Sequence, residues 1–108
     1  MPRILYTVRV TLPTVHQRGR FLSWLYPDHV LAVKAGGAEA VRVVLPDQAD
    51  AAGPAVVETQ YVFPSRKVFD TYLREHAPTL RLEALKRFPP ESGAVFERQV
   101  AEIASELA

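Results

Sequence analysis

One histidine, His29, has the type and setting that best suit acid–base chemistry. Its imidazole changes charge near neutral pH, so it can accept or donate a proton under ordinary conditions. It follows Trp24 by five residues, in a helical segment that Pro27 should kink or break. This imidazole is the candidate general acid or base. The commoner alternative is a half-exposed helical histidine bonded to a neighbouring carbonyl, and the catalytic role stays unassigned.

Charged and polar residues on three predicted strands form a second candidate set: Arg9, Arg42, Glu58 and Gln60. They alternate with apolar residues and therefore share the face opposite the core. Glu58 is expected to lie between the two arginines, where charge-assisted hydrogen bonds can set the register of a dimer. Two arginines against one glutamate also leave one positive charge for an anionic ligand. We favour the interface over the ligand.

Aromatic residues can line a ligand pocket or fill the core, and the core is the commoner use. The aromatic residues that could line a pocket are Trp24, Tyr6, Tyr61, Phe69, Tyr72 and Phe88. No metal or cofactor is expected, because the three histidines include no pair at helical i, i+4 spacing. The glycine pair at 36–37 follows a helix, whereas a dinucleotide-binding loop follows a strand. No serine lies in a nucleophile arrangement with a histidine and an acid.

Alternation with a period of two predicts three strands, and a helical stripe follows the first and the third. Thr14 and Ser65 are expected to cap these helices. Residues 94–107 fit a helix or a strand, and we predict a strand over 94–101 because the topology needs a fourth. The chain is then α+β, a ferredoxin-like βαββαβ fold with a four-stranded antiparallel sheet and its helices on one face. The other three predicted strands cover residues 3–12, 39–45 and 56–63.

Length and composition narrow the class of protein. The 108 residues, 48% of them hydrophobic, fit a single domain over 1–108, with about 102–108 as a C-terminal tail. Thirteen Lys and Arg against twelve Asp and Glu give a net charge of +1, which does not favour a nucleic-acid partner. No apolar run approaches the ~20 residues of a membrane span, and no signal-peptide core is visible. We therefore expect a cytoplasmic protein without a membrane partner. The absence of cysteine excludes disulfides and thiol catalysis.

The sheet face without helices predicts self-association. It is too apolar for free solvent and too charged for a dry core, which is typical of an interface or a polar-lined cavity. We expect a homodimer that pairs through this face. Its apolar members are Leu5, Val44, Val56 and Val62.

Short motifs along the chain carry a family resemblance. They stand at residues 21–25, 29–31, 36–38, 60–61, 65, 72–73, 76–78, 80–81, 87–93 and 96–98. Their order and spacing resemble an uncharacterised bacterial family, a domain of unknown function that is similar to ferredoxin-like proteins of the dimeric α/β-barrel type. The resemblance implies the fold and a dimer, and it implies no activity. Pro27 departs from the family's pattern.

Two function classes follow. The first is a small homodimer that binds a small molecule or a protein without catalysis. The alternative is a cofactor-free monooxygenase-like or isomerase-like enzyme of the dimeric α/β-barrel kind. A closed pocket that reaches His29, with a second polar group in hydrogen-bond reach, would favour the enzyme.

Overall fold

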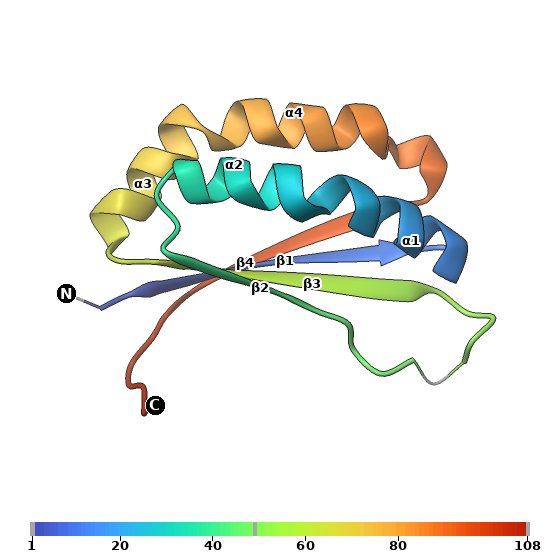
Figure 1. Ribbon diagram of the computed structural model, residues 1–108, viewed down its shortest axis with the longest axis horizontal. Coiled ribbons are helices and arrows are strands. Elements are labelled where there is room, and N and C mark those ends of the chain that lie inside the picture. Colours follow the sequence, from blue (N-terminus) through green and yellow to red (C-terminus); the bar gives the residue numbers. More distant parts are fainter. Residues whose placement is uncertain (1, 49, 108) are drawn as a thin grey trace.

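The structure, a computed structural model, describes residues 2–48 and 50–107 (Figure 1). Its four strands form one antiparallel sheet in the order β2-β3-β1-β4. This confirms the predicted fold, including the fourth strand that could also have been a helix. The strands are β1 (Ile4–Leu12), β2 (Ala40–Val44), β3 (Ala55–Phe63) and β4 (Val95–Glu102).

All helices cover one face of this sheet, and the other face is left open (Figure 1). The predicted caps are confirmed: the Thr14 hydroxyl accepts a hydrogen bond from the backbone N–H of Gln17, and the Ser65 hydroxyl accepts one from that of Val68. The last of these helices begins before Pro78, because a proline is tolerated in the first helical turn. The helices are α1 (Val15–Trp24), α2 (Val30–Ala35), α3 (Arg66–Glu75) and α4 (Ala77–Arg87), with a short 3-10 turn at Pro90–Ser92.

A wide turn over Leu25–His29 joins α1 to α2 and confirms the break expected at Pro27. Proline has no N–H to donate, so the regular helical bonding is interrupted there. Tyr26 adopts extended backbone angles, with φ −121° and ψ 131°. This irregular turn carries His29 above the sheet.

The core between helices and sheet is largely aromatic. Phe69 of α3 is 1% exposed, and its ring centroid lies 5.2 Å from that of Tyr6 and 5.1 Å from that of Phe63. Tyr72, one helical turn later, is also buried. Leu73, the next residue, is half-buried and packs against this core.

After β4 the chain continues without regular structure over residues 103–107 and turns to the side of the sheet opposite the helices (Figure 1). The Arg3 side chain anchors this tail, since it forms ion pairs with Glu39 and with Glu106. Within the described residues, no helix has the length and apolar character to cross a membrane.

Candidate functional site

His29 and Trp24 form a stacked pair on the helix layer. Their ring centroids lie 4.4 Å apart, with an angle of 29° between the ring planes. Both side chains are half-buried. The break at Pro27 produces this contact, because it shifts the helical register between the two residues. The pair is therefore a product of the irregular turn.

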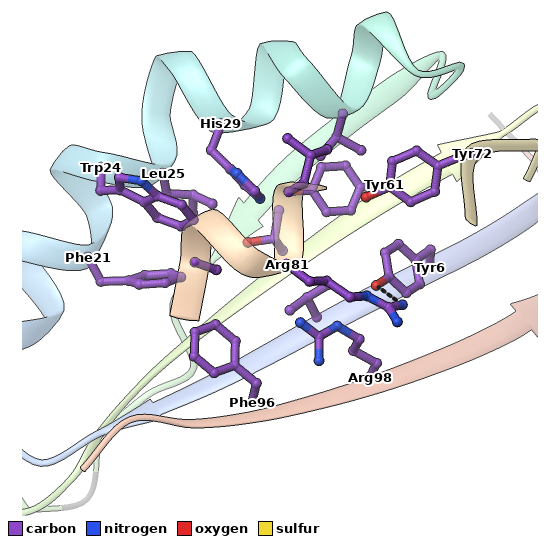
Figure 2. A pocket seen from close by; sticks show the side chains of 15 residues that line it. Tyr6, Phe21, Trp24, Leu25, His29, Tyr61, Tyr72, Arg81, Phe96 and Arg98 are labelled. Atoms are coloured by element: carbon purple, nitrogen blue, oxygen red, sulfur yellow. Dashed lines mark hydrogen bonds between the residues drawn. The ribbon is translucent and has the colours of Figure 1, made fainter. Parts of the chain in front are cut away.

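Beneath this pair lies a small hollow between the helices and the sheet (Figure 2). Its volume is about 30 Å³, which holds one or two water molecules. Aromatic rings make most of its wall, and a few polar side chains reach it from the sheet and from α4. The aromatic members are Tyr6, Phe21, Trp24, His29, Tyr61, Tyr72 and Phe96, and the polar ones are Thr59, Arg81 and Arg98.

A wider groove lies on the outer side of the same pair. It has a volume of about 420 Å³ and runs between the α1–α2 segment and α4. Trp24 and His29 line both the hollow and the groove, so the stacked pair is a wall between the two spaces. The other groove residues are Ser23, Asp28, Ala32, Glu83, Lys86 and Arg87.

The surroundings of His29 favour its neutral form. Burial lowers the pKa of its imidazole, the positive charge of Arg98 lowers it further, and the carboxylate of Glu83 opposes both. A neutral imidazole can accept a proton from a bound molecule. Among the described residues, however, no side chain forms a hydrogen bond with the ring.

Tyr61 and Tyr72 of the hollow are neutral phenols. Burial raises the pKa of Tyr61 above its ordinary value, and it raises that of Tyr72 to about 12. Tyr6 accepts a hydrogen bond of 3.2 Å from Nη2 of Arg81. The hollow thus presents phenol groups and guanidinium groups.

Arg81 and Arg98 were missed by the sequence analysis. Arg81 stands three residues before Ala84 and seven before Phe88, which are both buried, so helical spacing places it on the inner side of α4. Arg98 stands two residues after Phe96 in β4, so the two side chains share the inner face of this strand. A charged residue on an apolar face was the signal available in the sequence.

The other candidates lie on the open face of the sheet. Arg9 forms an ion pair of 3.3 Å with Glu58, and the Gln60 side-chain amide donates to the same carboxylate at 3.1 Å. Arg42 donates to the Gln60 carbonyl oxygen and not to Glu58. The expectation that Glu58 lies between the two arginines needs correction, because the register pairs Arg42 with Gln60 and pairs Glu58 with Val44.

The charges on this face are nearly balanced. The register of β4 places Glu97 beside Arg9, on the side away from Glu58. Two arginines therefore face two glutamates, which removes the spare positive charge that suggested an anionic ligand. No group of metal-binding side chains occurs in the part of the chain that the structure describes.

The predicted site residues thus separate into two sets. Trp24, His29 and Tyr61 meet at the hollow under the helices, where Tyr61 is 2% exposed. The charged and amide residues form a hydrogen-bonded row on the opposite face: Arg9, Glu58, Gln60 and Arg42. The sheet separates the two sets.

Solved structures resemble the chain over its full length. A dimeric ferredoxin-like protein from an uncultured marine organism matches with a TM-score of 0.69 and 15% identity, covering 99% of this chain and 100% of that one. The fold is that of the dimeric ferredoxin-like proteins. A variant of SnoaB, a cofactor-independent oxygenase from Streptomyces nogalater, matches with a TM-score of 0.69 and 11% identity, covering 99% of this chain and 98% of that one. No protein-family model and no curated protein matches the sequence.

A second dimeric ferredoxin-like protein from an uncultured marine organism has a TM-score of 0.59 and 17% identity, and the match covers 100% of this chain and 93% of that one. At these identities the likeness concerns the fold, and a fold of this kind hosts unrelated functions. The fold expected from the motif resemblance is confirmed.

Proposed function

We propose that this chain is a small-molecule-binding homodimer. Each protomer holds its ligand in the hollow under the helices and pairs with a second copy through the open face of the sheet. The stacked pair of Trp24 and His29 carries the proposal. It separates a hollow of about 30 Å³ from a groove of about 420 Å³, so a movement of two half-buried side chains joins them into a ligand-sized space. A cytoplasmic location stays a prediction of the sequence.

The composition of the open face supports pairing with a second copy. Leu5, Val44 and Val62 are half-buried there, and Val95 at the β4 edge is 54% exposed. Covering such surface contributes ~25 cal/mol per Å². The balanced charges of the same face can be satisfied within it or across a two-fold axis, whereas a strongly charged face would repel its own copy. Similar solved structures described as dimeric add support.

His29 favours a second candidate, a cofactor-free oxygenase-like or isomerase-like enzyme. Its neutral imidazole would take a proton from an acidic C–H or O–H group, and the electron pair would stay on the ligand as an enolate or phenolate. In an isomerisation the same proton returns to a different atom. In an oxygenation the anion passes electrons to dioxygen, which is then a co-substrate. We rank binding without catalysis first, because no side chain of the described residues forms a hydrogen bond with the ring.

Native mass spectrometry of the freshly purified protein tests the binding proposal and the dimer together. We expect the mass of a dimer carrying a small molecule. Ala84→Leu should remove that molecule, because Ala84 lines the hollow and a larger side chain fills it. Ala35→Leu makes the same change at an exposed position and is the matched control. Circular dichroism checks that both variants fold.

A monomer at micromolar concentration contradicts the dimer, and a small molecule that both variants retain equally contradicts the hollow as its site. The His29→Gln variant separates binding from catalysis. If the wild type converts the co-purified molecule and His29→Gln binds it unchanged, the enzyme is the better description. If the wild type and His29→Gln both bind the molecule and neither converts it, the result supports binding without catalysis.

A further inference from the structure

The Arg81 guanidinium has N–H donors without a hydrogen-bond acceptor, and aromatic side chains surround it. It reaches from α4 into the hollow, where its Nη2 donates to the Tyr6 hydroxyl at 3.2 Å (Figure 2). Its Nε is shielded from solvent and has no hydrogen-bond partner. A guanidinium carries five N–H donors, and the Tyr6 hydroxyl accepts only one of them. Within the described residues, no carboxylate lies within ion-pair distance of Arg81.

Arg98 brings a second cation to the same hollow from the opposite side. It extends from the inner face of β4, with its guanidinium carbon 5.6 Å from the centroid of the Phe96 ring. No carboxylate of the described residues pairs with it. Both arginines act on Tyr72, whose pKa they pull down while burial raises it. Two unpaired positive charges therefore converge on one small space.

Unpaired cations are costly where water is scarce. The guanidinium of Arg81 is half-buried and has no counter-charge, so it loses hydration and gains no Coulomb attraction in return, whereas Arg98 is exposed and keeps its hydration. The nearby carboxylate of Glu83 does not offset this cost, since it lines the outer groove and not the hollow. An anion placed between Arg81 and Arg98 would receive charge-assisted hydrogen bonds from both.

The walls of the hollow select the shape of that anion. Trp24 and His29 present stacked flat faces above it, and Phe21 meets Phe96 edge-on at a centroid distance of 6.2 Å. Flat aromatic walls fit a planar ring system in offset-stacked or edge-on contact. The arginines lie toward β1 and β4, at the other end of the hollow from Trp24 (Figure 2).

We propose that Arg81 and Arg98 bind the anionic group of a planar aromatic ligand, whose ring system lies against Trp24. This inference rests on the proposed function and names the class of ligand. The anionic group is a carboxylate or an ionised phenol or enol. Guanidinium groups favour the ionised form of either, so the same pair would hold a ligand anion whether or not a reaction follows.

Two matched probes test the charge requirement. 1-Naphthoate and 1-naphthamide have nearly the same shape, and only the first is an anion. Trp24 is the chain's only tryptophan, so its indole N–H gives a single tryptophan side-chain peak in a nitrogen–proton correlation spectrum. We expect naphthoate to shift that peak with about tenfold higher affinity than naphthamide, since charge-assisted hydrogen bonds are the stronger ones.

Variants assign the effect to the two arginines. Arg81→Met and Arg98→Met should each weaken naphthoate binding about tenfold and leave naphthamide within about twofold. Arg74→Met, on the exposed side of α3, is the control and should change neither. If Arg81→Met does not fold, Arg98→Met decides the result, because Arg98 is exposed at the sheet edge.

Equal binding of the two probes, or naphthoate binding that survives Arg98→Met unchanged, overturns the anion site and leaves the proposed function standing. If neither probe moves the Trp24 peak, the hollow does not take planar ligands. That result overturns this inference, whereas the proposed function is decided separately by the mass of the freshly purified dimer.

Discussion

Glu58→Ala should weaken the homodimer while changing the fold of each protomer little. In the isolated chain the Glu58 side chain is 20% exposed and that of its partner Arg9 is 47% exposed. Such an ion pair contributes only about 0–1 kcal/mol to folding, because water solvates the arginine. Gln60 also loses its acceptor, and it can turn to solvent in the monomer.

In the dimer the contribution of this ion pair is larger. A second sheet on the open face removes water from Arg9 and Gln60, so the loss of Glu58 leaves a charge buried without compensation. Removing one partner of such a pair costs about 2–5 kcal/mol of association. At 1.4 kcal/mol per factor of ten, the dimer Kd should rise roughly thirtyfold to several thousandfold.

Sedimentation velocity over a concentration series measures that Kd. Arg66→Ala is the control, because Arg66 lies on α3, away from the open face, and pairs with Glu102 only at 3.9 Å. It should leave the Kd within about fivefold, as expected for an exposed ion pair. If Glu58→Ala and Arg66→Ala dimerise alike, or if the dimer forms through the helices, the account of the open face is wrong.

Three further predictions concern the protomer. Phe69→Ala should lower the free energy of unfolding by about 3–5 kcal/mol in chemical denaturation, because it empties the centre of the aromatic core. The control Leu82→Ala, at a position 60% exposed, should lower it far less. Equal losses of unfolding free energy in the two variants would show that Phe69 is not at the centre of the core. Gly37→Ala should destabilise by more than about 1 kcal/mol, since φ is +124° there and a Cβ would stand 2.6 Å from a methyl carbon of Val68; an unchanged melting temperature would contradict that geometry. Burial lowers the pKa of His29 in the folded state, so the unfolded chain binds more protons than the folded one at mildly acidic pH. The stability that depends on a neutral His29 is therefore fully present above about pH 6.5, the ordinary pKa of histidine. It is lost as the pH falls through the lowered pKa of the folded state. The wild type should therefore lose more stability than His29→Gln between about pH 8 and pH 5 in denaturation titrations, and parallel curves would show that burial does not lower this pKa.

The sequence predicted the sheet well because period-two alternation reports directly on which strand face is buried. It also predicted both helix caps and the break at Pro27, since each depends on a local property of one residue. The fourth strand at Val95–Glu102 was ambiguous locally, and the need of β1 for a second neighbour decided it. Such a need is a property of the whole topology.

The hollow was harder to predict because it depends on residues far apart in the chain. Arg81 and Tyr6 are separated by 75 positions, and their hydrogen bond requires α4 to cross β1 at one place. The role expected for Glu58 shows the same limit. Parity placed it on the correct face, but the register that pairs Arg42 with Gln60 follows from the β2–β3 connection. The spacing of residues along a strand or helix predicts which face each side chain lies on. Which side chains contact one another depends on how the elements pack.

A crystal structure of the protein grown with 1-naphthoate would show the ligand site and the dimer contact together. We expect the naphthalene ring against Trp24, with its carboxylate within hydrogen-bond distance of Arg81 and Arg98, and two copies joined through their open sheet faces. A naphthoate molecule on the open face, with the hollow still closed beneath His29, would contradict this expectation.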